Sequence, residues 1–386
     1  MKIIFRGLTL LLFFSCTEKA SEQIAEGAIQ TQTYTENQLE NLQITLDTLK
    51  VDVGEEIINA TAYFGYGLGE DKETIFFADG MNTEVHAYNI PDLKLERRIV
   101  FEKDGPNRAP DFINFFQVLP KEEFMLANYA IQAVFNNQAE KILDIKARPE
   151  EYEGLDESLS SLYGFLHVSP DKKLAISRPL EYGDASVSLV MMDLENKTGK
   201  MLPLPGLEIT NKFRASFSEG GGTTTMGDNL VIQEVRDQLV IYSASTADIY
   251  VYDWNSKELK LIEYDHQLVP DQKSGDFPTE AGSREELMEI AQQIRNQVSF
   301  MGFLWDNSRQ QYFRFANKQN GFLETGEPRK LDWYLFSYDE NFNLLGETEL
   351  KNLSNFFYQS FFYQGKIFSY FPVDEDPGFV IMTLNF

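Results

Sequence analysis

Cysteine is almost absent from this chain of 386 residues, whose only thiol is Cys16. A single cysteine excludes any disulfide within the chain, so its stability must come from packing. Histidine is scarce as well, with only His86, His167 and His266, and no H-E-x-x-H, C-x-x-C or G-x-S-x-G motif occurs. We therefore expect no metal site and no cofactor, and we assign no catalytic residue.

Positive charge is in short supply too. The chain has 34 Lys and Arg against 60 Asp and Glu, which gives a net charge of −26. Nucleic-acid binding requires clusters of Lys and Arg that neutralise phosphates, so we expect no nucleic-acid partner. The acidity is typical of a well-solvated surface, and an acidic binding surface is the alternative.

No apolar run in the sequence is long enough to span a membrane, since a membrane-spanning helix needs about 20 apolar residues. The longest such run covers residues 8–14 and is interrupted by Thr9. Lys2 and Arg6 precede it without any acidic residue. A positive segment followed by a short apolar one predicts a secretory signal peptide, which we place at residues 1–15.

The lone cysteine follows this run directly. Phe13-Phe14-Ser15-Cys16 resembles the lipobox of bacterial lipoproteins, although Phe13 and Phe14 stand where Leu and a small residue are usual. The resemblance implies a diacylated Cys16 as the first residue of the mature chain. The alternative is a core cysteine. Acyl chains would hold the protein on a membrane, and we expect the outer membrane because Thr17 replaces the Asp that signals inner-membrane retention.

The segment that follows is polar and poor in aromatic residues. Residues 16–35 are predicted to form a flexible tether after the lipidated cysteine. Removal of residues 1–15 leaves 371 residues with a net charge of −28, since Lys2 and Arg6 are lost. Residues 36–386 are predicted to form one domain.

Aromatic residues are abundant at 13% of the chain, and a local pattern recurs through it. A short apolar strand, a turn with Asp or Asn, and a second apolar strand occur at 85–101, 133–145, 189–204, 249–264 and 334–350. Each copy follows another strand-like run, such as TIFFADG at 74–80. A sixth copy, from 366 to 386, ends the chain without its last strand.

Six such units predict an all-β fold, a six-bladed β-propeller. Each unit is a sheet that cannot cover its own faces, and packing in a closed circle hides them. The sixth unit lacks an outer strand, and the alternating residues 42–53 can supply it, which would close the ring. Two stacked β-sandwiches are the alternative.

Several motifs support a resemblance to known propellers. Residues 169–177, SPDKKLAIS, resemble the strand–turn–strand repeat of TolB-type propellers, with Lys172 where Gly is common. Gly105-Pro106-Asn107 with DFINFFQVLP, and the segments FLWD (303–306) and YFR (312–314) with Arg309, resemble six-bladed propeller lipoproteins. The chain thus resembles an uncharacterised family of such lipoproteins typical of Bacteroidetes, which implies a fold and an envelope location but no activity.

One insertion interrupts the repeats. Ser283 and Glu286 form a capping box, and apolar residues follow at helical spacing, which predicts a helix over 283–298. The helix is expected to pack on the propeller, and a lid over one channel mouth is the alternative. Residues 219–225, EGGGTTT, lack the Gly-Lys-Ser/Thr of a P-loop and are predicted to be a flexible loop.

The remaining candidates for a site are arginines in or beside strands. An unpaired guanidinium is costly to bury, so Arg178, Arg214, Arg236 and Arg314 either form ion pairs or face the central channel. In the second case they would form, with Tyr182 and Trp305, a candidate binding site for a carboxylate, phosphate or sugar. Asp265-His266 is a loop pair without a nucleophile, and Asp374-Glu375-Asp376 is a solvated turn rather than a calcium site.

These observations predict a lipid-anchored propeller in the bacterial cell envelope. We expect it to act as a binding or interaction module whose partner is a small molecule, a glycan or a protein. The alternative is a propeller hydrolase or lyase with a site in the channel, and a scaffold with a filled channel is a third possibility.

Overall fold

The computed structural model describes residues 29–30, 34–159, 161–179, 187–321, 331–351, 353 and 359–386. Cys16, the signal peptide at 1–15 and most of the predicted tether lie outside these residues. Among the described residues, no helix is long and apolar enough to cross a membrane.

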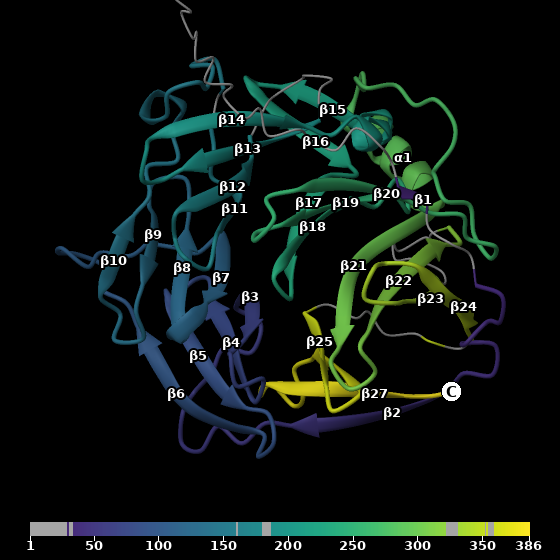
Figure 1. The fold of residues 1–386 in the computed structure, drawn as a ribbon, viewed down its shortest axis with the longest axis horizontal. Coiled ribbons are helices and arrows are strands. Elements are labelled where there is room, and N and C mark those ends of the chain that lie inside the picture. The colour runs from purple at the N-terminus through teal and green to yellow at the C-terminus, as the bar shows by residue number, and fades with distance from the viewer. Residues whose placement is uncertain are drawn as a thin grey trace, which may run out of the picture.

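Six sheets stand around a central axis like the blades of a propeller (Figure 1). From the axis outward, blade 1 contains β3 (Tyr63–Leu68), β4 (Thr74–Asp79), β5 (Glu84–Asn89) and β6 (Lys94–Val100). Blade 2 contains β7 (Phe115–Leu119), β8 (Glu123–Ala127), β9 (Gln132–Phe135) and β10 (Lys141–Asp144). Blade 3 contains β11 (Gly164–Val168), β12 (Leu174–Arg178), β13 (Ser188–Asp193) and β14 (Thr198–Pro203).

The second half of the ring adds two strands from the N-terminal region. Blade 4 contains β17 (Leu230–Val235), β18 (Gln238–Ser243), β19 (Ile249–Asp253), β20 (Leu259–Glu263) and β1 (Ile29–Gln30). Blade 5 contains β21 (Val298–Asp306), β22 (Gln311–Gln319), β23 (Leu331–Tyr338) and β24 (Leu344–Leu350). Blade 6 contains β25 (Ser360–Tyr363), β26 (Lys366–Tyr370), β27 (Gly378–Asn385) and β2 (Gln43–Lys50).

The ring closes as the sequence predicts. β2 pairs antiparallel with β27 along its whole length, from Gln43 opposite Asn385 to Lys50 opposite Gly378. The two strands lie side by side in Figure 1 although more than 300 residues separate them. An ion pair between Lys50 Nζ and Asp376 Oδ2, 2.5 Å apart, ties β2 to the 374–376 turn. The six-bladed propeller and its closing strand are therefore confirmed.

The described end of the predicted tether contacts the propeller at two points. Ile29 and Gln30 pair parallel with Ile262 and Glu263 at the outer edge of blade 4. The Tyr34 hydroxyl donates a hydrogen bond to Glu347 Oε1 at 2.9 Å. The last part of the predicted tether is thus attached to the propeller.

The apolar core is divided into six layers, one between each pair of neighbouring blades. For example, Phe76 and Ala87 of blade 1 pack with Phe124 and Phe135 of blade 2. Blades 6 and 1 share a layer in the same way, built around Phe77 and Phe379. Each apolar layer is shared by two neighbouring blades around the ring, which rules out the alternative of two stacked β-sandwiches.

The outer turns carry the Asp and Asn residues that the repeat requires. Asn89, Asn136, Asp193, Asp253 and Asp339 each begin the turn between the last two strands of blades 1 to 5. In each turn the side-chain oxygen accepts a hydrogen bond from a backbone N–H two to four residues later. These caps pre-shape the hairpins, so one residue type recurs at one structural position.

Lys172 lies in the left-handed region of backbone conformation, with a φ of 60°. Glycine fits that conformation without cost, which explains its usual presence in the motif. The Lys172 ammonium instead forms an ion pair with Glu123 at 2.6 Å.

Glutamine side chains join neighbouring blades near the axis, at every second junction of the ring. Gln117 of blade 2 donates to Val168 O at 3.0 Å and accepts from Val168 N–H at 2.9 Å, in blade 3. Gln233 of blade 4 makes the same two bonds to Phe303 of blade 5, at 2.8 and 2.9 Å. Gln359, beside blade 6, donates to Tyr63 O of blade 1 at 3.1 Å.

The strands that receive these amides share a second feature. β3, β11 and β21 each contain a register shift against the next strand, whereas β7, β17 and β25 do not. Each of these inner strands is also the edge of its sheet, where backbone groups lack ladder partners on one side, and the glutamine amide bonds to such groups. In blade 5 the bulge includes Gly302, where a Cβ atom would lie 2.4 Å from Gln233 Oε1.

Replacement of Gln233 by leucine should test the importance of these contacts. Leucine keeps the volume but leaves the N–H and C=O of Phe303 unpaired, so we expect a loss of about 2 kcal/mol or more in the free energy of unfolding. Urea denaturation followed by circular dichroism measures this loss. The exposed Gln138→Leu variant is the control and should change stability by less than about 0.5 kcal/mol; equal effects of the two variants would contradict the assignment.

Candidate functional site

Arg178 and Arg214 lie together where blade 3 meets the inner strand of blade 4. Arg178 ends β12, and its Nη1 donates to the carbonyl of Leu230, the first residue of β17, at 3.0 Å. Its guanidinium stands 5.2 Å from the centre of the Phe165 ring. Because the inner strands surround the axis, this contact places the arginine pair at the channel end where β17 begins.

No ion pair between either arginine and a carboxylate occurs among the described residues. Both side chains are half-buried, and burial holds both pKa values below their usual range. The charge of Arg214 lowers the pKa of Arg178 further, so the two guanidinium groups repel each other. Two desolvated like charges are unfavourable unless an anion joins them, which makes the pair a candidate anion site.

Arg214 belongs to a small cap on the propeller that the sequence only partly predicts. The cap consists of a 3₁₀ segment (Pro205–Phe213), the hairpin of β15 (Arg214–Glu219) and β16 (Gly222–Gly227), and α1 (Arg284–Arg295). The hairpin turns at Gly220 and Gly221, both with positive φ, as a two-residue turn requires. The glycine-rich segment is therefore a hairpin turn rather than a flexible loop.

The helix begins as predicted but packs on the hairpin instead of a blade. Ser283 Oγ accepts a hydrogen bond from the Glu286 N–H at 3.1 Å and caps α1. Leu287, Ile290 and Ile294 face Phe213 and Ala215 of the hairpin region. The cap is fixed to blade 4 by Lys273 and Asp228, a buried ion pair of 2.7 Å. The helix thus supports the element that carries Arg214.

Arg314 was expected in an ion pair or in the channel, and the structure shows neither. It is fully buried in the layer between blades 4 and 5. Its guanidinium donates to Met301 O at 2.7 Å and Ala247 O at 2.5 Å and lies 4.9 and 4.8 Å from the Phe300 and Phe303 rings. These contacts favour a structural role.

Arg236 and Trp305 form a contact of their own, away from the arginine pair. The Arg236 guanidinium lies 4.2 Å from the centre of the Trp305 ring. Arg236 follows the end of β17, six residues beyond Leu230, and six residues of strand span about 20 Å. The predicted site is therefore divided between opposite ends of the channel. Tyr182 lies outside the described residues.

His86 and His167 are buried in strands, as expected for packing residues. His86 Nδ1 lies 2.7 Å from the Tyr63 hydroxyl and its Nε2 lies 3.0 Å from Glu84 Oε2. His167 Nδ1 donates to Phe165 O at 3.0 Å. Burial lowers the pKa of His167 from 6.5 to about 4.

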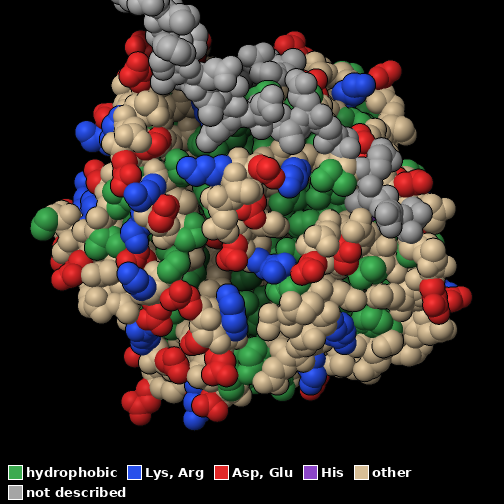
Figure 2. Space-filling model, in the orientation of Figure 1, with side chains coloured by type: hydrophobic (Ala, Val, Ile, Leu, Met, Phe, Trp, Pro, Cys, Tyr) green, Lys and Arg blue, Asp and Glu red, His purple; other side chains and the backbone are tan. Residues whose placement is uncertain are grey.

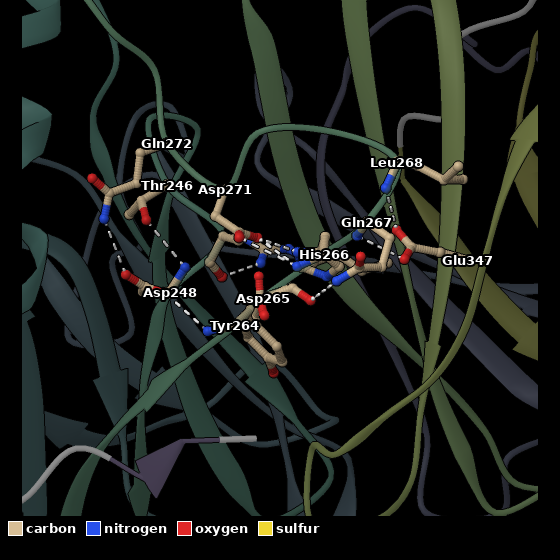
Figure 3. A network of polar contacts seen from close by, with 12 residues as sticks. Thr246, Asp248, Tyr264, Asp265, His266, Gln267, Leu268, Asp271, Gln272 and Glu347 are labelled. Atoms are coloured by element: carbon tan, nitrogen blue, oxygen red, sulfur yellow. Dashed lines mark hydrogen bonds and ion pairs between the residues drawn. The ribbon is translucent and has the colours of Figure 1, made fainter. Parts of the chain in front are cut away.

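His266 has a partner, but it is Asp271 rather than Asp265 (Figure 3). The imidazole Nδ1 lies 2.5 Å from Asp271 Oδ1, and Nε2 lies 3.0 Å from the Tyr338 hydroxyl. Glu347 accepts the N–H groups of Gln267 and Leu268 at 2.8 and 3.0 Å. Figure 3 shows this loop held between Asp271 and Glu347, which indicates that the network positions the loop leading to the cap.

Glu234 is a half-buried carboxyl group that sequence reasoning missed. It lies on β17 and its Oε2 accepts a hydrogen bond from Gln117 Nε2 at 2.8 Å, although these residues belong to blades 4 and 2. Burial raises its pKa from 4.5 to about 7. A carboxylate inside the apolar run LVIQEV is the only signal that could have drawn attention to it.

Charge on the surface is mixed. Figure 2 shows Lys and Arg side chains interspersed with Asp and Glu around a central hollow on the face drawn. No group of three or more His, Cys, Asp or Glu suited to a metal ion occurs among the described residues. The arginine pair differs from this surface because its members lack opposite charges within ion-pair distance among those residues.

Residues 39–349 match the family model described as a domain of unknown function, DUF4221. The chain belongs to this family. A DUF4221 family member from Bacteroides vulgatus has a solved structure with a TM-score of 0.63 and 15% identity, over 89% of this chain and 98% of that one. The solved structure of a candidate exported protein from Bacteroides fragilis has a TM-score of 0.51 and 12% identity, over 93% of this chain and 99% of that one. No curated protein matches the chain.

The comparisons support the uncharacterised propeller family that the motifs suggested. At 15% and 12% identity these likenesses show the fold alone. For a DUF4221 chain, the function must therefore be argued from the residues that line its own sites.

The pH dependence of stability should identify Glu234 as a desolvated acid. Its folded pKa lies above its unfolded value, so the folded state binds the extra proton between about pH 4.5 and 7. Its contribution therefore favours folding at low pH and is lost as the pH rises through that window, by about 3 kcal/mol in total. The free energy of unfolding should be measured with denaturant at pH 5 and pH 8. Relative to the wild type, the Glu234→Gln variant should be more stable at pH 8 than at pH 5.

The low pKa of His167 makes the stability rise with pH over about pH 4 to 6.5. This contribution is present in both the wild type and the Glu234→Gln variant. The difference between variant and wild type therefore isolates Glu234. Glu258→Gln, at an exposed site, serves as the matched control. Parallel pH profiles for Glu234→Gln and wild type would contradict the assignment.

Proposed function

We propose that this DUF4221 protein is a lipid-anchored binding module of the bacterial cell envelope, and that it holds an anionic group at Arg178 and Arg214. The observation that carries the binding proposal is the pair of half-buried guanidinium groups without a carboxylate partner among the described residues. In a chain with a net charge of −26, carboxylates are abundant, so the lack of one beside these arginines in the described part of the chain is informative.

The geometry suits recognition of a carboxylate or a phosphate. A guanidinium group presents N–H donors in a planar fork that matches two oxygens of such a group. Arg178 donates one hydrogen bond to Leu230 O, which fixes its orientation, and its other donors have no partner among the described residues. The Phe165 ring covers one face of the guanidinium and reduces contact with water, which strengthens charged hydrogen bonds.

The envelope location rests on the N-terminal sequence. A charged segment, a short apolar run and Cys16 form a lipoprotein-type signal, and acyl chains would supply the membrane attachment. The candidate exported protein from Bacteroides fragilis has the same fold. Attachment at Cys16 is therefore proposed together with an outer-membrane location.

Binding at the arginine pair can be measured by isothermal titration calorimetry with inorganic phosphate, succinate and glucuronate, and with glucose as the uncharged comparison. We expect at least one anion to bind, and Arg178→Gln and Arg214→Gln each to weaken it about tenfold or more, since a charged hydrogen bond contributes more than 1.4 kcal/mol. Arg236→Gln, at the other end of the channel, should leave the affinity unchanged.

The sequence between β12 and β13 includes Glu181 and Asp184, which offers a further control. If these carboxylates neutralise the arginines, the double variant E181Q/D184N should bind the anion much more tightly than the wild type. Equal losses from Arg178→Gln and Arg236→Gln would contradict the assigned site.

The lipid anchor is tested by Cys16→Ser expressed in a Bacteroidetes host. We expect wild-type protein in the membrane fraction with a diacylated Cys16 in its N-terminal mass spectrum, because more than one acyl chain is needed for firm attachment. The variant should lose the modification and leave the membrane fraction. An unmodified Cys16 in membrane-bound wild-type protein would contradict the proposal.

A further inference from the structure

A row of exposed apolar side chains crosses blades 1 and 2. Its members are Phe64, Met81, Phe112 and Tyr129, whose exposed fractions are 56%, 73%, 38% and 65%. Scattered exposed apolar residues are ordinary, but a contiguous group marks a binding surface. Continuity is therefore the property to establish.

Backbone hydrogen bonds bring the segments of this row together. Gly80 N–H donates to Ala62 O at 3.1 Å, and Ile113 N–H donates to Gly80 O at 3.0 Å. These bonds bring together the segments that carry Phe64, Met81 and Phe112. The Phe112 and Tyr129 rings then follow with their centres 5.8 Å apart.

The row ends at a cavity of about 630 Å³ between blades 2 and 3. Tyr129 belongs to both the row and the cavity wall, and Tyr163 lines the cavity just before β11. The other lining residues are Gln132, Ala147, Arg148, Pro149, Glu150, Glu157, Ser158, Leu159 and Ser161. Two phenol rings thus share one cavity with amide, hydroxyl, guanidinium and carboxylate groups.

Several of these polar groups have no partner among the described residues. Arg148, Glu150 and Glu157 form no side-chain hydrogen bond or ion pair there, and neither do the hydroxyls of Tyr129 and Tyr163. Elsewhere in the described part of the chain, arginines are often paired, as in Arg98 with Glu84 and Arg309 with Asp306. The cavity therefore offers both donors and acceptors that remain available to a ligand.

We propose that this cavity and the adjoining row bind an uncharged oligosaccharide, a function that goes beyond the anion site proposed above. A sugar ring has an apolar face of C–H groups, which packs on an aromatic ring, and a rim of hydroxyls that both donate and accept hydrogen bonds. Tyr129 and Tyr163 supply the first kind of contact, and Arg148, Glu150 and Glu157 supply the second.

The charges that line the cavity and the net charge of the chain favour an uncharged glycan over a polyanionic one. One Arg and two Glu line the cavity, so it offers no excess of positive charge, and the chain as a whole carries −26. An acidic polysaccharide would be repelled by this field. The row beyond the cavity extends the surface across two blades, which suits a chain of several sugar units rather than a single one.

A second cavity of about 630 Å³, near blades 5 and 6, suits a glycan less well. Its walls include Glu36, Glu40 and Asp339 with several amides, and its Tyr34 hydroxyl already bonds Glu347. Phe386 also lines it, and its ring lies 5.1 Å from the Arg309 guanidinium. This cavity provides a matched control site in the same protein.

The proposal is tested by calorimetry with maltoheptaose, cellohexaose, xylohexaose, mannohexaose and a β-1,3-glucan hexamer, with hexagalacturonate as the charged comparison. We expect at least one neutral oligosaccharide to bind more tightly than hexagalacturonate. Tyr129→Ala and Tyr163→Ala should each weaken it about five- to tenfold, which corresponds to the loss of one ring contact.

Tyr129→Ala changes a largely exposed side chain, so its folding should be unaffected, and an unchanged melting temperature verifies this. Phe386→Ala should leave the affinity unchanged, and so should Arg178→Gln, which separates this site from the anion site. Absence of binding by all the neutral sugars, a preference for hexagalacturonate, or a loss confined to Phe386→Ala would overturn the proposal.

Discussion

Every blade of this propeller depends on its two neighbours, because the apolar core lies between sheets and not within them. Six layers of buried side chains alternate with six sheets around the axis. An open series of such sheets would expose one apolar face at each end and one unpaired strand edge. The pairing of β2 with β27 removes both defects at once, since it places the first and last parts of the chain in one sheet.

The glutamine contacts near the axis reveal a second level of order. Blades 2, 4 and 6 supply amides, and blades 1, 3 and 5 supply the bulged inner strands that receive them. The ring therefore behaves as three pairs of blades rather than as six equal units. Each bulged inner strand is also the edge of its sheet, and the amide of the preceding blade bonds to backbone groups of that edge.

The propeller could be predicted because its determinants are local. The outer turns need Asp or Asn at one position, and the missing strand of the sixth unit left a vacancy that residues 42–53 could fill. Hydrophobic alternation and turn chemistry are visible in a single sequence. The capped helix followed from Ser283 and Glu286 for the same reason.

The sites could not be predicted in the same way, because they join residues through register and three-dimensional packing. Arg178 and Arg214 meet only because a hairpin leads from blade 3 to blade 4, and the glycines of that hairpin were interpreted as a loop. Arg314 is held by two carbonyls whose positions depend on neighbouring strands. His266 selects Asp271 over the adjacent Asp265 because the loop folds back on itself.

The short strand β1 has a consequence for how the propeller is presented. Ile29 and Gln30 join the outermost strand of blade 4, so the polypeptide reaches the body at its circumference rather than at either opening of the axis. A membrane linkage on the N-terminal side of that point would hold the disc by its edge. Both flat surfaces would then be open to the surrounding medium, and ligands could approach the two proposed sites without passing between the protein and the bilayer.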